Sequence, residues 1–470
     1  MSQPGKKRLL SEAAAALTPP AKQTKLAPLF QKDQPTDYQW LPPLKTGAEG
    51  PRAKGCGHFV WGEPKGASKI AAFDIDGTII KPKSGAKFPK DADDWQFLWP
   101  EVVPKIREAS ESGCATLALA LDCTAFDRSA EKRSYAVVLV SNQAGNDAQQ
   151  RKFRDKLPNV CRKIGVPLHA FAAYDYDIHR KPATGMWDAY VEKFNEGIEV
   201  DYTQSYYVGD AAGRPEDHND TDRKMAINCG LPFLTPEQYF HNKPAPTNWT
   251  LTGWDAASYN ASSPFCSPNS TPLLPRRLSE FDDVPPEVVL FVGSPGSGKT
   301  SFYQKHFAPK GYVHVNQDTL RTRDACLKAV RAALSSTPPA SVVVDNTSPT
   351  ASVRAEYLTL VRSSFAELGV RVRCFFFSAD KELCMHNAVY RASYDRVDRG
   401  NGKPRDLLPM IAFEAYRKNL EEPTLDEGFD EIKRITFKFD GDADALRKWQ
   451  RWLADVYPRP RAKKATSTKK

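Results

Sequence analysis

The stretch from Val288 to Thr300, VVLFVGSPGSGKT, constrains the fold of this chain more than any other segment. Its leading apolar residues predict a buried strand over 288–292, and residues 301–307 predict the start of a helix. Between them the glycines, the lysine and the threonine fit the phosphate-binding spacing G-x-x-x-x-G-K-[ST]. A glycine-rich strand–helix turn can also arise by chance. The strand before it and the helix after it favour a nucleotide site in an α/β domain.

Each part of this loop has a physical reason. Glycines let backbone N–H groups turn inward around a phosphate without a Cβ in the way. Lys299 can reach the outer phosphates, the Thr300 hydroxyl can ligate Mg²⁺, and the positive end of the following helix faces the anion. The residues predicted to bind ATP are Gly293, Ser294, Pro295, Gly296, Ser297, Gly298, Lys299, Thr300 and Ser301.

The length and composition are those of a chain with more than one globular domain. Its 470 residues are 41% hydrophobic and 26% charged, which suffices for two or three domains with cores of their own. No run of 18 apolar residues and no apolar leader occurs, so neither a membrane span nor a secretory signal is expected. Nine cysteines without a C-x-x-C pair predict reduced thiols rather than a zinc site or a disulfide framework.

The positive charge is concentrated at the two ends. Residues 1–54 carry nine Lys/Arg and four Asp/Glu, and residues 458–470 carry six Lys/Arg and no acid, so the body holds 9 − 5 − 6, about −2, of the formal +9. We therefore expect a disordered basic tail over 1–54 and a basic C-terminal tail over 458–470. Lys6, Lys7 and Arg8 are either a nuclear import signal or part of a solubilising tail, and a transit peptide is a weaker alternative.

A second chemical stretch, KIAAFDIDGTII, covers residues 69–80. Residues 70–75 predict a buried strand, and Asp74 and Asp76 lie two apart, so their side chains leave the strand end on the same side. Neighbouring carboxylates are costly unless a cation lies between them or one stays protonated. Gly77 permits the sharp turn that follows. A solvated acidic turn is the alternative, and the motifs that come next disfavour it.

Three later segments again place polar residues where a predicted strand ends. They are VVLVSNQAG at 137–145, RKP at 180–182, and YYVGDAAGR at 206–214 with Asp222 further on. In an open α/β sheet, the carboxyl ends of successive strands bring such polar residues together at one edge, where ligands bind.

These motifs resemble those of the haloacid-dehalogenase-type phosphotransferases, which have a Rossmannoid α/β fold. The resemblance implies that Asp74 attacks phosphorus and forms an aspartyl phosphate, and that Asp76 protonates the leaving oxygen and later activates water. Lys181 would neutralise the phosphate and the nucleophile. The implied substrate ligands are Ser141, Asn142 and Arg180, and the implied Mg²⁺ ligands are Asp74, Asp210, Asp222 and the backbone carbonyl of Asp76.

The segment 241–286 is rich in Pro, Ser and Asn and predicts a linker between a domain over 55–240 and a domain over 287–457. Trp249 and Trp254 within it predict that the linker packs against a domain surface.

Beyond the phosphate loop, acidic residues again follow predicted strands. Asp318 follows a strand that begins at residue 313, and Asp345 ends a strand that begins at residue 342. Arg391 and Arg396 lie in a stretch that predicts a mobile lid bearing arginines. Phosphoryl transfer needs such cations, because negative charge spreads over the equatorial oxygens in the transition state. Surface arginines at this density are more commonly only solvated.

The order of the two domains resembles the polynucleotide kinase 3′-phosphatase family, which repairs the ends of broken DNA strands. The resemblance spans residues 55–457 and is carried by FDIDGT, SNQAG, RKP with GMW, YVGDAAGR, GSPGSGKTS, VNQDTL, DNT, HN and YRKNLEEPTLDEGF. It implies an enzyme that uses ATP and Mg²⁺ to restore 5′-phosphate and 3′-hydroxyl ends. A nuclear monomer acting on DNA ends, with DNA ligase and repair scaffold proteins as possible partners, is the corresponding expectation.

The same resemblance implies roles in the second domain. Asp318 would be the general base for a 5′-hydroxyl, and Arg391 or Arg396 would stabilise the γ-phosphoryl group. Arg321 would contact the acceptor nucleotide. Asp345 would support the site or contact substrate, with structural support alone an equal interpretation.

The chain also departs from the family pattern. Animal members carry a forkhead-associated domain, which needs about 100 residues, more than the first tail offers. Gln317 and Val389 stand where the family has basic residues, and residues 109–133 predict an insertion without an assigned role. Two other functions compete with this interpretation: a small-metabolite kinase fused to a phosphatase, and an inactive end-binding scaffold.

Overall fold

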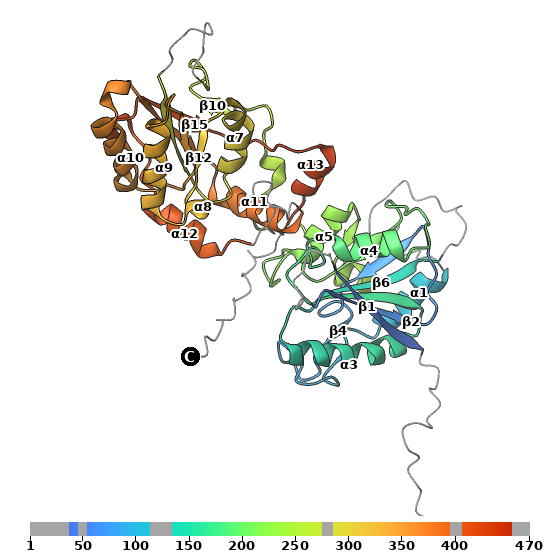
Figure 1. The fold of residues 1–470 in the computed structure, drawn as a ribbon. Coiled ribbons are helices and arrows are strands. Elements are labelled where there is room, and N and C mark those ends of the chain that lie inside the picture. The colour runs from blue at the N-terminus through green and yellow to red at the C-terminus, as the bar shows by residue number, and fades with distance from the viewer. Residues whose placement is uncertain (1–36, 46–53, 113–133, 275–284, 395–406, 454–470) are drawn as a thin grey trace, which may run out of the picture. The chain divides into compact units, whose positions relative to one another are not determined.

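The computed structural model describes residues 37–45, 54–112, 134–274, 285–394 and 407–453. They form two α/β bodies, each built on one largely parallel sheet (Figure 1). Both basic tails lie outside the described residues except for 37–45 and 54, and so does the predicted insertion from residue 113 onward. Among the described helices, none is long and apolar enough to cross a membrane.

The first body is a seven-stranded sheet of order β1-β2-β7-β6-β3-β8-β9, in which β2 pairs antiparallel with both of its neighbours and the other strands run parallel. Its strands are β1 (Tyr38–Leu44), β2 (Cys56–Trp61), β3 (Ile70–Phe73), β6 (Ala136–Asn142), β7 (Leu168–Ala173), β8 (Tyr206–Val208) and β9 (Phe233–Leu234). A small antiparallel pair, β4 (Ile80–Lys81) and β5 (Gln96–Phe97), lies in the segment after β3.

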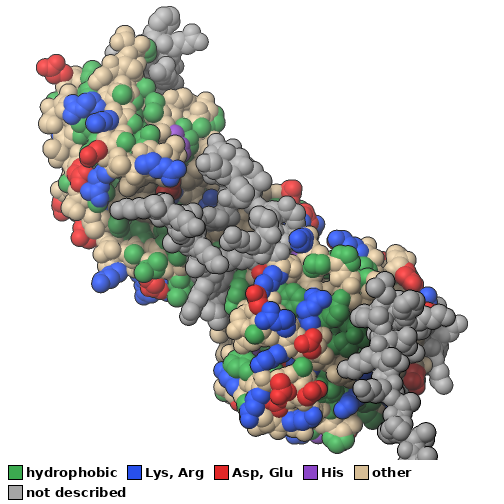
Figure 2. Space-filling model, turned by 60° about the horizontal axis from the view of Figure 1, so that its bottom comes forward, with side chains coloured by type: hydrophobic (Ala, Val, Ile, Leu, Met, Phe, Trp, Pro, Cys, Tyr) green, Lys and Arg blue, Asp and Glu red, His purple; other side chains and the backbone are tan. Residues whose placement is uncertain are grey.

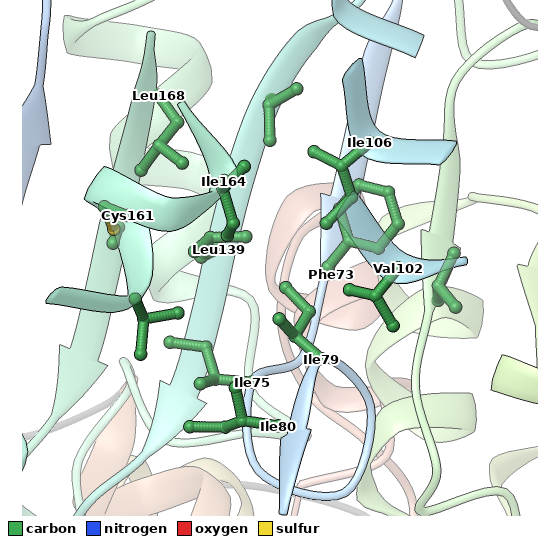
Figure 3. Packing of buried hydrophobic residues seen from close by; sticks show 14 of the residues in the cluster. Phe73, Ile75, Ile79, Ile80, Val102, Ile106, Leu139, Cys161, Ile164 and Leu168 are labelled. Carbon is green, nitrogen blue, oxygen red and sulfur yellow. The ribbon is translucent and has the colours of Figure 1, made fainter. Parts of the chain in front are cut away.

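Helices cover both faces of this sheet. They are α1 (Val102–Ser112), α3 (Asp147–Ile164), α4 (Gly185–Lys193), α5 (Thr221–Cys229) and α6 (Pro236–His241). Residues of α1, α3 and α6 pack into one buried apolar cluster, and residues of α4 and α5 pack into the cluster on the other face. Figure 3 shows the first cluster, where Ile106 of α1 and Ile164 of α3 close over Phe73 and Leu139 of the sheet. Burial on both faces explains why β3 and β6 are continuously apolar.

The expectation that residues 1–54 are a disordered tail is wrong for 38–44, which form β1 at the edge of this sheet. The segment contains two prolines and no sustained hydrophobic period, but its aromatic side chains pack against the first body. Tyr38 stacks on Phe59 with ring centroids 5.4 Å apart, and Trp40 meets the same ring edge-on at 5.0 Å. Arg154 of α3 lies over the Trp40 ring at 4.2 Å. Tertiary packing therefore overrides the local composition.

Because β1 covers Phe59, we expect its deletion to destabilise the first body. A chain beginning at residue 46 should lose roughly 2–5 kcal/mol of unfolding free energy relative to a chain beginning at Asp37, the scale of removing large aromatic side chains from a core. Thermal unfolding of the two chains measures this. Trp40→Ala, which removes one of the two covering rings, should fall between them. Equal midpoints for all three chains would contradict a structural role for β1.

The second body is a six-stranded sheet of order β10-β15-β14-β11-β13-β12, parallel except for β10. Its strands are β10 (Cys266–Ser267), β11 (Glu287–Gly293), β12 (Val313–Val315), β13 (Val342–Val344), β14 (Arg371–Phe377) and β15 (Glu431–Ile435). Its helices are α7 (Lys299–His306), α8 (Gln317–Leu320), α9 (Arg323–Leu334), α10 (Ala351–Ser364), α11 (Lys381–Ser393), α12 (Met410–Asn419) and α13 (Ala443–Trp449). Residues of α9 and α10 join one apolar cluster and residues of α7 join the other, so this sheet too is covered on both faces.

The predicted linker over 241–286 is partly built into the domains. Its β10 strand pairs with β15 and so belongs to the second sheet. Both tryptophans have partners, because Arg223 lies over the Trp249 ring at 4.2 Å and Trp254 lies 4.9 Å from the ring of Trp449. The prediction that these rings pack against domain surfaces is confirmed. The segment 241–286 is therefore not a simple spacer between the two domains.

On the face shown in Figure 2, basic and acidic side chains are interspersed over both bodies, with no field of one sign across either. This agrees with the nearly balanced formal charge, about −2, of the chain between its two basic tails. Contacts with a polyanion such as a nucleic-acid strand must then be local.

Candidate active sites

The carboxyl edge of the first sheet brings three acidic residues together. Asp74 directly follows β3, and its backbone N–H donates to Val208 O of β8 at 2.9 Å. Asp210 lies two residues beyond β8, and Asp222 lies in the first turn of α5. One carboxylate oxygen from each can be found within 4.8 Å of the others. The three predicted metal-ligating side chains are therefore assembled in one place.

Burial makes the carboxyl groups of Asp74 and Asp210 hard to ionise. It raises the pKa of Asp74 to about 7, with Lys181 opposing the shift and Asp222 adding to it. It also raises the pKa of Asp210 to about 8, and the charges of Asp74 and Asp222 act in the same direction. A divalent cation would relieve this repulsion. The donor set fits one, because among the described residues Asp74 Oδ2 is buried without a hydrogen-bond partner.

The turn after the nucleophile position requires glycine. Gly77 has φ +96°, and a Cβ there would lie 2.3 Å from Asp210 Oδ2. Only a residue without a side chain leaves room for the Asp210 carboxylate beside this turn. The D-x-D-G spacing thus serves the acidic cluster directly.

Lys181 is the cation of the site. Its ammonium group lies 2.5 Å from Asp74 Oδ1 and 2.8 Å from Asp222 Oδ1, and its side chain is 3% exposed. Burial opposes the charged form, but Asp222 and Asp74 outweigh it and raise the pKa of Lys181 above its ordinary value. The hydroxyl of Tyr207 also donates to Asp222 Oδ1, at 2.9 Å. A permanently charged lysine therefore stands against the Asp74 carboxylate.

The predicted substrate ligands lie at this edge in different situations. Ser141 is the penultimate residue of β6, and its hydroxyl accepts from Gln143 Nε2 at 2.9 Å. Asn142 instead exchanges two hydrogen bonds with the backbone of Lys181, at 2.9 and 3.1 Å, so it holds the lysine segment in place. The Arg180 guanidinium lies over the exposed ring of Tyr176 at 4.5 Å.

Asp76 is more exposed than Asp74, and two side chains hold it. Lys156 Nζ donates to Asp76 Oδ1 at 2.8 Å, and Gln143 Nε2 donates to Asp76 Oδ2 at 2.7 Å. Sequence reasoning singled out neither Lys156 nor the specific role of Gln143. Gln143 stood inside a quoted motif. Lys156 lies among the buried residues of α3, and no local pattern identifies Asp76 as its partner.

In the second body β11 and α7 frame the phosphate loop. Lys299 Nζ donates to the loop carbonyls of Gly293 and Ser294, each at 2.9 Å. Burial lowers the pKa of Lys299, and the charge of Asp345 opposes this. Gly296 has φ +78°, and a Cβ there would lie 2.3 Å from the backbone oxygen of Cys384. The loop thus packs closely on α11, as the glycine spacing requires.

The predicted acidic partners converge on the same loop. Asp345 follows β13, is 3% exposed, and accepts from Thr300 Oγ1 at 2.7 Å and from His314 Nε2 at 3.0 Å. Although burial works against the charged form, His314 and Lys299 hold the pKa of Asp345 below its ordinary value. Its other oxygen, Oδ1, is buried without a partner among the described residues, which suits a site for a cation near Thr300.

Asp318 lies on α8, whose first turn is capped by Asn316 through its side-chain oxygen. Its charge favours the charged form of Lys299, whereas that of Arg391 from α11 opposes it. Arg321 ends α8 with φ 74° and an exposed side chain. Arg396 lies outside the described residues. The second site therefore gathers its acid, lysine and one arginine from three different elements.

A cavity of about 520 Å³ adjoins the phosphate loop. It is lined by Gly296, Ser297 and Gly298 of the loop, by Arg391, and by aromatic rings that include Tyr390, Phe437, Phe439 and Trp449. Its volume is that of an ordinary small-molecule site. The loop is thus open to a ligand on this side.

A hydrogen-bonded relay supports the loop from below. Asn387 Nδ2 donates to Gly296 O at 2.9 Å, and Trp449 Nε1 donates to Asn387 Oδ1 at 2.8 Å. His386 reaches the Trp449 carbonyl at 2.7 Å. The HN pair of the sequence therefore connects the phosphate loop to α13.

Comparisons with known proteins agree with this geometry. The profile described as polynucleotide kinase 3 phosphatase matches residues 69–240, and that described as AAA domain matches residues 288–423. The chain is 34% identical over 396 residues to a bifunctional polynucleotide phosphatase/kinase of Schizosaccharomyces pombe, covering 83% of this chain and 85% of that protein. It is 29% identical over 416 residues to a protein named putative bifunctional polynucleotide phosphatase/kinase of Acanthamoeba polyphaga mimivirus, covering 82% and 88%. A polynucleotide 3′-phosphatase of Saccharomyces cerevisiae is 30% identical over 226 residues, covering 37% of this chain and 87% of that protein.

Proposed function

Because this chain belongs to the family of bifunctional polynucleotide phosphatase/kinases, we propose that the site around Asp74 removes a 3′-phosphate and that the site around Lys299 phosphorylates a 5′-hydroxyl. The protein is an enzyme with both activities. The observation that carries the residue assignment is the pairing of a buried carboxylate that has an unused oxygen, Asp74, with the permanently charged Lys181.

In the phosphatase reaction, Asp74 attacks the phosphorus of a terminal 3′-phosphate. The bond to the 3′-oxygen breaks, and Asp76 gives that oxygen a proton, so that a 3′-hydroxyl leaves and an aspartyl phosphate remains. Asp76 then takes a proton from water, which releases inorganic phosphate and restores Asp74. Lys181 compensates the negative charge in both steps, and the Ser141 hydroxyl binds a phosphoryl oxygen.

In the kinase reaction, the cavity beside the phosphate loop, with its aromatic lining, would hold ATP. Asp318 takes the proton from a 5′-hydroxyl as the oxygen attacks the γ-phosphorus in line, and ADP leaves. Lys299 and Arg391 compensate the charge that spreads over the transferring group. Arg321, exposed beside Asp318, is available to the acceptor strand. Asp345 fits a supporting role better than a substrate contact, because its neighbours are Thr300 and His314.

Mg²⁺ at each site would neutralise phosphate charge. Asp74, Asp210 and Asp222 would hold it in the first site and Thr300 in the second, with Asp345 behind. We further propose that the substrates are DNA ends, that the enzyme works in the nucleus during repair of strand breaks, and that it acts as a monomer alongside a DNA ligase. The basic Lys6–Arg8 run supports nuclear import.

One assay tests this proposal. An oligonucleotide that bears a 5′-hydroxyl and a 3′-phosphate is incubated with the full chain, with and without ATP, and the ends are resolved by mass. We expect 3′-dephosphorylation without ATP, both changes with ATP, and neither after chelation by EDTA until Mg²⁺ is added back. DNA and RNA versions of the strand, and free nucleosides as competitors, define the acceptor. Phosphorylation of nucleosides in preference to strands would contradict the proposal.

A further inference from the structure

Lys156 is a buried charged residue beside the first site to which the roles above assign no purpose. It lies in the middle of α3, its side chain is 5% exposed, and its ammonium group contacts Asp76, whose own side chain is 44% exposed. A buried ammonium group is costly unless it is paired and hydrogen-bonded. Lys156 is nevertheless among the buried residues of α3, and the charged partner of Lys156 is Asp76.

Both oxygens of Asp76 are fixed from different elements. Lys156 on α3 holds Oδ1, and Gln143 after β6 holds Oδ2. The same Gln143 amide nitrogen also donates to Ser141 Oγ, so one amide group links Asp76 Oδ2 to the predicted phosphoryl ligand Ser141. With a donor on each oxygen, the Asp76 carboxyl group is held in one orientation.

We propose that Lys156 is a positioning residue of the phosphatase reaction, which acts by holding Asp76 in the orientation that delivers a proton to the leaving 3′-oxygen. The inference rests on the proposed role of Asp76. Lys156 acts through the Asp76 carboxylate, which is its charged partner in the structure. Proton transfer requires donor and acceptor heavy atoms within about 2.6–3.2 Å, so a carboxyl group free to rotate spends less time in reach.

A purely structural role would give a different result. Lys156 also lies 5.6 Å from the Phe153 ring centroid and could merely help to seat α3 on the sheet. A loosened helix would slow every substrate alike. A misplaced general acid slows only those substrates whose leaving group needs a proton. A sugar 3′-oxygen leaves as a strongly basic alkoxide unless it is protonated, whereas an aryl phosphate releases a stable phenolate.

The test compares these two substrates in single-turnover experiments on the full chain. Lys156→Met keeps the length and apolar stem of the side chain. We expect leaving-group release from a 3′-phosphate oligonucleotide to slow by about 10-fold or more, part of the 10²–10⁴-fold that a general acid contributes, and release from an aryl phosphate to stay within about twofold of wild type. Lys156→Arg, which keeps the charge, should recover part of the loss. Lys163→Met, an exposed lysine on the same helix, should change neither rate.

A double substitution closes the argument. If Lys156 acts through Asp76, adding Lys156→Met to Asp76→Asn should slow the oligonucleotide no further. Equal slowing of both substrates, no slowing, or an additive loss in the double variant would overturn the inference. If Asp76→Asn slows release from the oligonucleotide and Lys156→Met does not, only the inference about Lys156 is contradicted. If Asp76→Asn does not slow release either, the proposed role of Asp76 is contradicted as well.

Discussion

Asp74→Asn is expected to reduce release of 3′-phosphate by at least about 10³-fold, because an amide cannot replace the carboxylate as nucleophile. The kinase rate on a 5′-hydroxyl strand should stay within about twofold, since β3 and the phosphate loop belong to different sheets. The fold should not suffer. The pKa of Asp74 is raised in the folded chain, so its charge at pH 7 opposes folding, and a neutral Asn removes that opposition.

The measurement uses one labelled strand for both activities, followed by thermal unfolding. Asp91→Asn is the matched control, because Asp91 is an exposed acid in the same body and lies outside the acidic cluster. A lowered melting temperature for Asp74→Asn would mean that the carboxylate is structural. Normal 3′-phosphatase activity would mean that another residue is the nucleophile.

The second large effect is expected for Lys299→Met. Removing the ammonium group should lower γ-phosphate transfer by about 10²-fold or more, the scale of losing a preorganised charge in a phosphoryl-transfer site. The carbonyls of Gly293 and Ser294 also lose their donor, so binding of ATP should weaken. Release of 3′-phosphate should be unchanged.

Transfer from labelled ATP and a nucleotide-binding titration separate these two effects of Lys299→Met. Lys310→Met, an exposed lysine after α7, is the control and should behave as wild type. Loss of both enzymatic activities in Lys299→Met would contradict two independent sites. Retention of transfer would remove Lys299 from the reaction.

The fold and the sites could be predicted from the sequence where one short motif both shapes the backbone and carries a reacting group. The strand before Gly293 and the strand before Asp74 are apolar on both faces, so their positions could be predicted from composition alone. The glycine at 77 and the glycine at 296 are required by contacts of under 2.5 Å that a Cβ would make. Motifs of this kind encode the turn and the reacting group in one short segment.

Features that depend on distant packing could not be predicted. β1 is a strand because Tyr38 and Trp40 find Phe59, which no local pattern reveals. Asn142 was assigned to substrate, yet its amide is used by the backbone of Lys181, 39 residues away. Lys156 reads as an ordinary helical lysine until α3 is placed beside Asp76. In each case the deciding contact joins segments that the sequence keeps apart.

The relay from Gly296 through Asn387 to Trp449 has a consequence for biosynthesis. A ribosome releases the phosphate loop early and the tryptophan that braces it much later. During that interval the nascent loop has its glycines and its lysine but lacks the indole that fixes Asn387 beneath it. The phosphate loop therefore reaches its fully braced form only after α13 has emerged and docked.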